Sequence, residues 1–300
     1  MTEQVAKGRW SDLGRRLVSA VVLVAIAAVD IWTGGLWFIL MVAGLVGLMA
    51  WELDRMTAPD GELVQAPGLA LMAAICLFGA VGFSAPIDVA LIGVIAVGFL
   101  GTDRRQRVPA TLAILAIMLA AMQLCLLQHK QGTPALLWLI GVVIASDVLG
   151  YFAGRLLGGP KFWPAISPKK TWSGTVAGWI GAGLVGLGFV TWGGAPWGLV
   201  WVSALLALAG QMGDIGESWL KRQAGVKDSS NLIPGHGGVM DRFDALTGAA
   251  LALFLLLHFF PALPLPLAEP DLDQGLIRFE IPLEDSVPSE PELFGPRIQP

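Results

Sequence analysis

The sequence predicts an all-α, polytopic integral membrane protein, and composition, hydropathy and long apolar runs lead to this fold class. Hydrophobic residues make up 55% of the 300 positions, only 14% are charged, and the mean hydropathy is +0.69. A soluble domain carries about 25% charged residues, so this chain has too few charges to cover a soluble globule. Disorder of the whole chain is excluded, because disordered chains combine low hydrophobicity with high net charge.

The apolar runs predict about nine membrane-spanning helices, within a range of eight to ten. A span needs roughly 20 apolar residues. Tryptophans near many expected helix ends fit the aromatic belts of membrane interfaces. The third and fourth runs are short and could together form one re-entrant pair. The expected spans are residues 16–32, 35–53, 68–83, 86–101, 109–127, 134–157, 174–192, 197–219 and 245–263.

The charged loops predict the orientation and the organisation of the chain. With the N-terminus in the cytoplasm, 16 of the 19 lysines and arginines fall in cytoplasmic segments, as the positive-inside rule requires. The C-terminal region is acidic and proline-rich without apolar periodicity, so we expect it to be disordered. The chain then divides into a cytoplasmic segment (1–15), N-terminal helices (16–140), a catalytic membrane region (141–264) with cytoplasmic loops at 158–173 and 220–244, and a tail (265–300).

The first polar group begins inside an expected span. Asp147, Tyr151 and Arg155 recur every four residues and therefore share one helix face. An ionisable residue within an apolar span indicates a functional site, although an ion pair with a neighbouring helix would also account for Asp147. Hydroxyl residues and lysines then precede a helix start, which suits a phosphate, although lysines also mark cytoplasmic helix ends in general. These residues are Ser167, Lys169, Lys170 and Thr171.

The second polar group extends from the end of one span to the start of the last. Asp241 and Asp244 lie one turn apart where the last span begins, and the helix macrodipole accounts for one of them more easily than for both. A helical stripe leaving the membrane comprises Asp214, Glu217, Ser218 and Lys221. The other polar or glycine positions of this group are Arg222, Lys227, Asp228, His236, Gly237, Gly238 and Arg242.

These residue types favour phosphoryl or nucleotidyl transfer at the membrane surface. Carboxylates without a Cys/His cluster suit a hard cation such as Mg²⁺, which binds one or two carboxylates together with substrate phosphates. Lysines and arginines beside them suit a phosphorylated substrate. Positioning and charge neutralisation supply most of the catalysis in such reactions. Because the groups lie at the cytoplasmic ends of spans, we expect one lipid substrate and one soluble substrate.

At this point the sequence resembles a known family, the phosphatidate cytidylyltransferases or CDP-diacylglycerol synthases. The similarity to the family's signature covers the 27 positions of residues 218–244 without a gap. Residues 146–147 and 167–172 are similar to the family's other segment. Two departures occur there: residues 148–150 replace the usual Thr-x-Ala, and Ser173 stands where glutamate is usual.

The resemblance implies that CTP and phosphatidic acid react to give CDP-diacylglycerol and pyrophosphate. It also implies Mg²⁺ and a monovalent cation such as K⁺ as cofactors, and a homodimer of mostly helical protomers. We expect a multi-pass protein of a bacterial-type inner (cytoplasmic) membrane, with the active site facing the cytoplasm. The partners are then CTP, phosphatidic acid and the lipid bilayer, and nucleic acid is not expected among them.

The expected roles of the site residues follow from this resemblance. Asp214 and Asp241 are expected metal ligands, with Asp244 as a third ligand or an outer partner. Asp147 is expected to support the metal centre or the lysines. The basic groups expected to hold phosphate oxygens are Lys169, Lys170, Lys221 and Arg222. The other expected substrate-binding residues are Ser167, Thr171, Ser218, Lys227, Asp228, His236, Gly237, Gly238 and Arg242.

Other functions are open at the level of sequence. A CTP-dependent lipid kinase of the polyprenol type, or a cytidylyltransferase for another phospholipid, would also use CTP beside membrane helices. A transporter or channel would place Asp147 and Asp214 along a pathway, although the charged motifs concentrate on one side of the membrane. Elsewhere, we interpret Glu52 and Asp54 as local ion-pair partners of Arg55.

Overall fold

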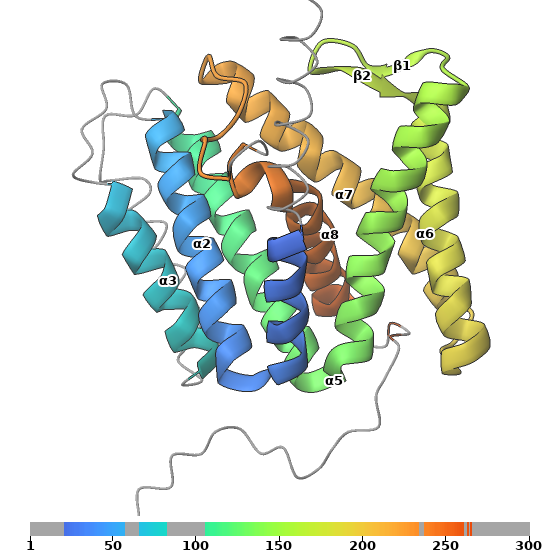
Figure 1. The fold of residues 1–300 in the computed structure, drawn as a ribbon, viewed down its shortest axis with the longest axis horizontal. Helices are drawn as coiled ribbons and strands as arrows, with labels where there is room; N and C mark the ends of the chain where they lie inside the picture. Colours follow the sequence, from blue (N-terminus) through green and yellow to red (C-terminus); the bar gives the residue numbers. More distant parts are fainter. Residues whose placement is uncertain are drawn as a thin grey trace, which may run out of the picture. The chain divides into compact units, whose positions relative to one another are not determined.

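The structure is a computed structural model of the chain, and it consists mainly of helices (Figure 1). The expected N-terminal segment, the expected span 86–101, His236 and all of the expected tail except Leu265 lie outside the residues that it describes. The described residues are 21–57, 66–82, 106–233, 237–260, 263 and 265.

The helices follow the apolar runs of the sequence. Among the described residues, five helices are long and apolar enough to cross a membrane, namely α2, α5, α6, α7 and α8. The count of nine spans therefore stays a prediction. The helices are Val21–Thr33, α2 (Gly35–Thr57), α3 (Ala66–Gly82), α5 (Arg107–Leu156), α6 (Trp172–Gly193), α7 (Gly198–Gln223) and α8 (Met240–Phe259).

Helix α5 contains two of the expected spans, which meet at a kink. Gly132 has φ 76° and ψ 178°, a conformation outside the helical region that glycine adopts readily. Pro134 follows two residues later and has no amide hydrogen to donate to the helix. The expected break between residues 127 and 134 is thus present as a local kink.

The loop expected at 158–173 contains a two-stranded antiparallel hairpin, which the sequence analysis did not foresee. Strand β1 (Lys161–Trp163) pairs with β2 (Ser167–Thr171). At the base of the hairpin, the hydroxyl of Ser173 donates a hydrogen bond to the carbonyl of Gly158. The Thr171 hydroxyl caps α6 by accepting from the amide of Gly174 at 3.3 Å. The fold is thus mostly helical, with this small exception.

Glycines let the helices around the polar groups approach closely. Helix α5 packs against α6 and α8, α6 against α7, and α7 against α8. A Cβ atom added to Gly213 of α7 would lie 2.9 Å from the Cα of Gly248 in α8. One added to Gly174 of α6 would lie 2.5 Å from the carbonyl oxygen of Gly150 in α5. Small residues commonly permit such backbone contacts between membrane helices.

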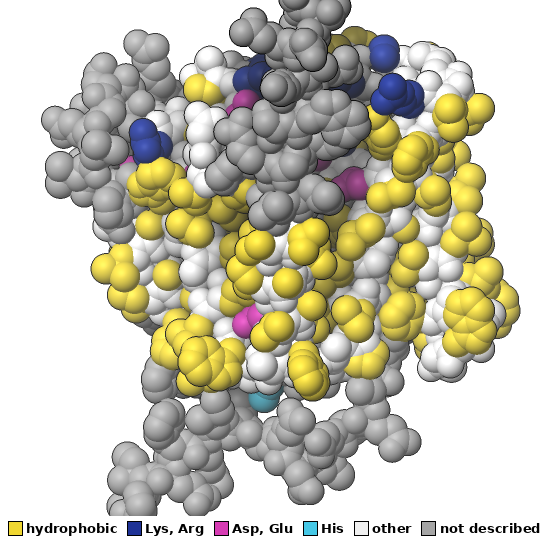
Figure 2. Space-filling view, viewed as in Figure 1, with side chains coloured by type: hydrophobic (Ala, Val, Ile, Leu, Met, Phe, Trp, Pro, Cys, Tyr) yellow, Lys and Arg dark blue, Asp and Glu magenta, His cyan; other side chains and the backbone are white. Residues whose placement is uncertain are grey.

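The outward faces of the helices carry large apolar side chains that a soluble protein would bury. Phe152, Ile180 and Trp201 are 54%, 60% and 78% exposed. In Figure 2, apolar side chains cover much of the described surface, while Lys and Arg side chains gather toward the end that carries the hairpin. An exposed apolar surface of this extent fits contact with lipid. The cytoplasmic orientation of the charged end stays a prediction.

Candidate functional site

A pocket of about 580 Å³ lies where α5, β2, α6, α7 and α8 meet. Helix α5 contributes the stripe of Asp147, Tyr151 and Arg155, and Arg155 donates a hydrogen bond to the Tyr151 hydroxyl at 2.7 Å. The structure therefore brings members of both polar groups into one cavity. The lining residues with predicted roles are Asp147, Lys169, Lys170, Thr171, Asp214, Asp241 and Asp244.

Lys170 connects the hairpin to α7 inside this pocket. Its Nζ lies 2.6 Å from Oδ2 of Asp214 and donates to the carbonyl of Gln211 at 3.2 Å. Gln211 is buried. In the sequence it marks only the start of the second polar group, and no role was assigned to it, because a lone glutamine has no distinctive spacing. It lies three residues before Asp214, so it shares that helix face. Its side chain bonds to Ser146, to the carbonyl of Thr175 and to Trp179.

Lys221 is buried between two carboxylates beside the pocket. Its Nζ lies 2.8 Å from Oε2 of Glu217 and 2.5 Å from Oδ1 of Asp241. A buried charge is costly unless it is paired and hydrogen-bonded, and Lys221 meets both conditions. Its direct contact with a substrate phosphate stays a prediction.

Asp241 organises the loop that precedes α8. Its Oδ2 accepts hydrogen bonds from the amide of Ser229 at 3.0 Å, from the Ser229 hydroxyl at 3.0 Å and from the amide of Gly238 at 2.8 Å. With Lys221 at Oδ1, both carboxylate oxygens have protein donors. Asp241 lines the pocket with Asp214 and Asp244, and its role as a metal ligand stays a prediction.

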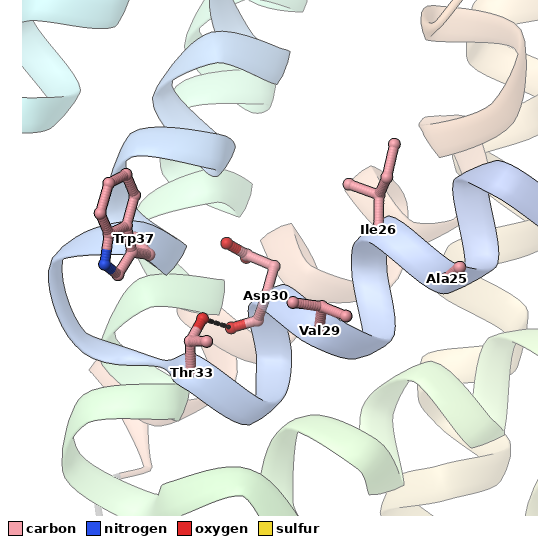
Figure 3. Close-up of a pocket in the computed structure, with 6 residues that line it drawn as sticks. All are labelled: Ala25, Ile26, Val29, Asp30, Thr33 and Trp37. Atoms are coloured by element: carbon pink, nitrogen blue, oxygen red, sulfur yellow. Dashed lines mark hydrogen bonds between the residues drawn. The ribbon is translucent and has the colours of Figure 1, made fainter.

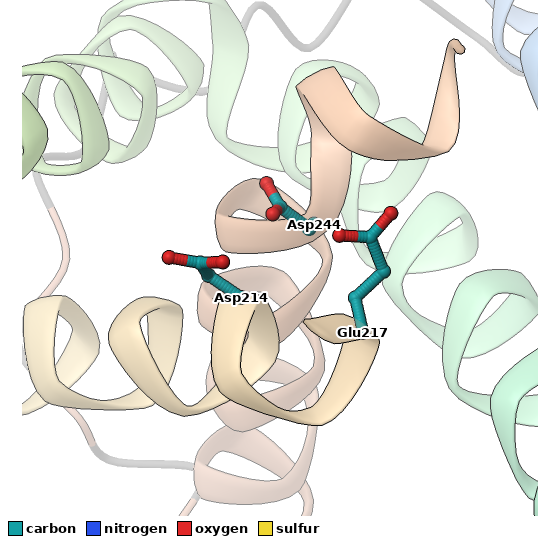
Figure 4. A group of neighbouring side chains, drawn as sticks. All are labelled: Asp214, Glu217 and Asp244. Atoms are coloured by element: carbon teal, nitrogen blue, oxygen red, sulfur yellow. The ribbon is translucent and has the colours of Figure 1, made fainter. Parts of the chain in front are cut away.

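Three carboxylates converge at the crossing of α7 and α8. Asp214, Glu217 and Asp244 each offer an oxygen within 4.8 Å of the others. Figure 4 shows Asp214 and Glu217 on α7 and Asp244 on α8 around a shared space. The Oε1 atom of Glu217 is buried and accepts no hydrogen bond from any described residue. Clustered carboxylates repel one another unless a cation or proton lies between them, so these residues fit a hard cation.

Other expected substrate-binding residues do not line the pocket. Ser218 donates a hydrogen bond to Asp214 at 3.3 Å and so orients that carboxylate. Gly237 has φ 82° and its carbonyl accepts from the amide of Ile233 at 2.8 Å, which pairs these two residues. His236 lies outside the described residues. The remaining residues absent from the pocket lining are Ser167, Arg222, Lys227, Asp228, Gly238 and Arg242.

A second pocket, of about 460 Å³, lies against the helix Val21–Thr33 and the start of α2 (Figure 3). Its described lining is apolar apart from Asp30 and Thr33, and the Thr33 hydroxyl donates to the backbone carbonyl of Asp30. Because no basic side chain is among these lining residues, this pocket does not suit a polyphosphate.

Comparison with known proteins points to one family. Residues 14–260 match the cytidylyltransferase family. A Brucella suis phosphatidate cytidylyltransferase is 40% identical over 161 residues, which are 52% of this chain and 57% of that protein. A Helicobacter pylori protein of the same name is 43% identical over 130 residues, or 43% of this chain and 48% of that protein. The chain thus spans about half the length of these two relatives. A third protein of that name, from Pseudomonas aeruginosa, is 34% identical over 265 residues, or 82% of this chain and 96% of that protein.

Proposed function

Because the chain belongs to the cytidylyltransferase family, we propose that it transfers the cytidylyl group of CTP to phosphatidic acid, forming CDP-diacylglycerol and pyrophosphate. The observation that carries this proposal is the pocket in which Lys169, Lys170 and Arg155 lie with four aspartates at one end of apolar helices. A lipid phosphate anchored in the bilayer and a soluble nucleotide can both reach such a position.

The proposed reaction joins two polyanions. An oxygen of the phosphatidate phosphate attacks the α-phosphorus of CTP, and the bond from that phosphorus to the β-phosphate bridge breaks, releasing pyrophosphate. A phosphate monoester has a second pKa of about 6, so it is mostly ionised at pH 7 and needs no strong general base. The chain must therefore mainly orient the two phosphates and offset their repulsion. The lysines and arginine of the pocket are suited to this task.

We assign Mg²⁺ to the cluster of Asp214, Glu217 and Asp244, with Asp241 as a further candidate ligand and a monovalent cation such as K⁺ nearby. A bound cation would neutralise phosphate charge and hold the triphosphate in place. Lys170 forms an ion pair with Asp214. If the Asp214 carboxylate binds a cation, Lys170 can instead bind a substrate phosphate. Asp147 lines the same pocket and would support the lysines.

The proposal includes finer features that come from the charge distribution and the family resemblance. The chain forms about nine spans with the N-terminus in the cytoplasm, divided at residues 15, 140 and 264 as the sequence predicts. It resides in a bacterial-type inner membrane with the pocket facing the cytoplasm, and two copies form a homodimer.

The decisive experiment is a liposome assay with purified protein, phosphatidate, labelled CTP and Mg²⁺. We expect labelled CDP-lipid and pyrophosphate in equal amounts, and loss of both with EDTA. A lipid kinase would instead produce a lipid phosphate and CDP from a lipid alcohol. Absence of any nucleotide product would leave the proposed reaction without support and favour transport.

The cation assignment is tested by removing one carboxylate at a time. Asp214→Asn and Glu217→Gln should each lower turnover by about 100-fold and raise the Mg²⁺ concentration needed for half-maximal activity. Asp30→Asn is the matched control, since Asp30 lines the other pocket, and it should keep wild-type activity. Wild-type turnover in Asp214→Asn and Asp241→Asn would show that the expected metal ligands are wrong.

A further inference from the structure

Glu52 lies in the last two turns of α2, far upstream of the expected catalytic region, and it is fully buried at 0% exposure. The interpretation of Glu52 as a local partner of Arg55 is wrong. The guanidinium of Arg55 lies over the ring of Trp51, 4.9 Å from its centroid. The carboxylate of Glu52 instead accepts hydrogen bonds from the segment that leads into α8.

Four donors from this segment meet the two oxygens of Glu52. Oε1 accepts from the Ser230 hydroxyl at 2.6 Å and from the amide of Val239 at 2.8 Å. Oε2 accepts from the Ser229 hydroxyl at 3.2 Å and from the amide of Met240 at 2.7 Å. The carboxylate therefore holds both ends of the loop 229–240 at a single point.

Glu52 also supplies the N-terminal cap of α8 from another helix. The first amides of a helix have no partner within it, and a side chain of the N-cap residue usually satisfies one of them. The N-cap here is Val239, which has no side-chain hydrogen bond to offer. A negative charge at this helix end is also favoured by the macrodipole.

A continuous polar chain runs from Glu52 to the carboxylate cluster. The Ser229 hydroxyl lies between Glu52 and Asp241, at 3.2 and 3.0 Å from their carboxylate oxygens, and its single hydrogen is shared between them. Asp241 then contacts Lys221, and Lys221 contacts Glu217. Each contact joins groups that are buried or half-buried, so the position of one carboxylate constrains the next.

Gly238 is fitted to this arrangement. A Cβ atom at this position would lie 2.5 Å from Oε1 of Glu52 and would also clash with the hydroxyl of Ser229. The glycine lets its amide reach Asp241 while the next two amides reach Glu52. Gly238 thus lets the carboxylates of Glu52 and Asp241 both approach the same backbone turn closely.

We propose that Glu52 is a positioning residue for the cytidylyl transfer. It fixes residues 229–230 and 239–240, and through them the orientation of Asp241 and Lys221. This inference rests on the proposed function for its kinetic consequence, but not for its structural one. Glu52 does not line the pocket, so its influence on the reaction passes through the loop.

Two substitutions distinguish the effect of the carboxylate charge of Glu52 from the effect of its side-chain length. Glu52→Gln keeps the size but turns one acceptor into an NH₂ group that faces a backbone amide. Glu52→Asp keeps both acceptors on a shorter side chain. The matched control is Thr57→Val, because Thr57 is also buried near the end of α2 but donates only to its own helix, at 2.8 Å to the carbonyl of Leu53.

Three measurements are made on each purified full-length variant. Turnover per folded molecule and the KM for CTP come from the liposome assay, and the melting temperature is measured in detergent. A spin label at Asn231→Cys, in a background with Cys76 and Cys125 replaced by serine, reports the mobility of the loop in the absence of any substrate.

We expect Glu52→Gln to lower turnover per folded molecule by about tenfold or more. We also expect it to increase the mobility of the spin label at position 231. Glu52→Asp should retain more turnover than Glu52→Gln, and Thr57→Val should match the wild type in turnover and label mobility. A Ser230→Ala change should lower turnover in the wild type but add little to Glu52→Gln, because both changes weaken the attachment of the same segment.

The inference is overturned if Glu52→Gln leaves the label as immobile as in the wild type. It is also overturned if turnover falls only in proportion to the loss of folded protein. If the wild type itself makes no CDP-lipid, the proposed function fails, whereas the label still reports whether Glu52 holds the loop.

Discussion

The pair of Lys170 and Asp214 combines close contact with partial exposure. Their side chains are 23% and 34% exposed and their charged atoms lie 2.6 Å apart. Solvent screens this partly exposed ion pair, so the free-energy cost of exchanging one partner is smaller than for a fully buried pair. Under the proposed function, we expect a substrate phosphate to replace Asp214 as the partner of Lys170.

Replacing this lysine tests its place in the pocket. Lys170→Ala should lower kcat/KM by about 100-fold, through a higher substrate KM or a lower kcat, because one cationic group at the phosphates is lost. The melting temperature should stay close to that of the wild type. Steady-state kinetics with varied CTP and phosphatidate measures the effect.

Lys161→Ala is the matched control, since Lys161 lies exposed in the same hairpin and does not line the pocket. It should retain wild-type kinetics. If Lys170→Ala behaves like this control, Lys170 does not belong to the site.

The two departures from the family pattern have structural counterparts. A Cβ at Gly150 would lie 3.1 Å from the carbonyl oxygen of Gly174, so glycine permits the close crossing of α5 and α6. Ser173 bonds to the carbonyl of Gly158 and joins the two ends of the hairpin. Both residues contribute to the packing around the pocket.

At the scale of elements, the crossing of α7 and α8 brings the carboxylates together. A Cβ at Gly248 would lie 2.5 Å from the carbonyl oxygen of Ala209 and 2.9 Å from the Cα of Gly213. These are backbone atoms that cannot rotate away. Asp214 and Asp244 lie beside this contact. The distance between their carboxylates therefore depends on the close approach that Gly213 and Gly248 allow.

Enlarging this contact should separate the carboxylates. Gly248→Ala should destabilise the protein by about 1–3 kcal/mol through overpacking and should raise the Mg²⁺ requirement of the reaction. Thermal unfolding and Mg²⁺ titration of activity measure the two effects.

Gly216→Ala provides the comparison, because a Cβ there meets nothing within 4 Å. Alanine favours the helix over glycine by about 1 kcal/mol, so this variant should be at least as stable as the wild type. Equal behaviour of the two variants would contradict the proposed role of the crossing.

At the scale of the whole molecule, the apolar surface and the position of the basic residues predict a single orientation in the bilayer. Asn231 follows the C-terminal end of α7, whereas Trp197 precedes its N-terminal end. Because α7 is long and apolar enough to span, these positions should face opposite sides.

Thiol labelling tests this orientation. In a background without Cys76 and Cys125, Asn231→Cys should react with a membrane-impermeant reagent only in inverted vesicles, and Trp197→Cys only from the outside of intact cells. The reverse pattern would contradict the predicted orientation of α7. Labelling of both from one side would exclude α7 as a span.

The sequence predicted more of the fold than of the contacts within it. Apolar runs indicated the helices because hydropathy is a local property, and the signature motif led to the family that the comparisons confirmed. The hairpin at β1 and β2 was missed because its short strands have no clear alternation. Glu217 shared the stripe of Asp214, yet its proximity to Asp244 depends on a neighbouring helix.

By itself, the sequence determined the membrane class, the helical segments and the family, since these depend on composition and on spacing along the chain. Only the tertiary structure decided which carboxylates share one space, which lysines line the pocket, and that Glu52 of α2 caps α8. The physical reason is that these contacts join residues far apart in sequence. Their distances depend on how closely glycines allow the helices to cross.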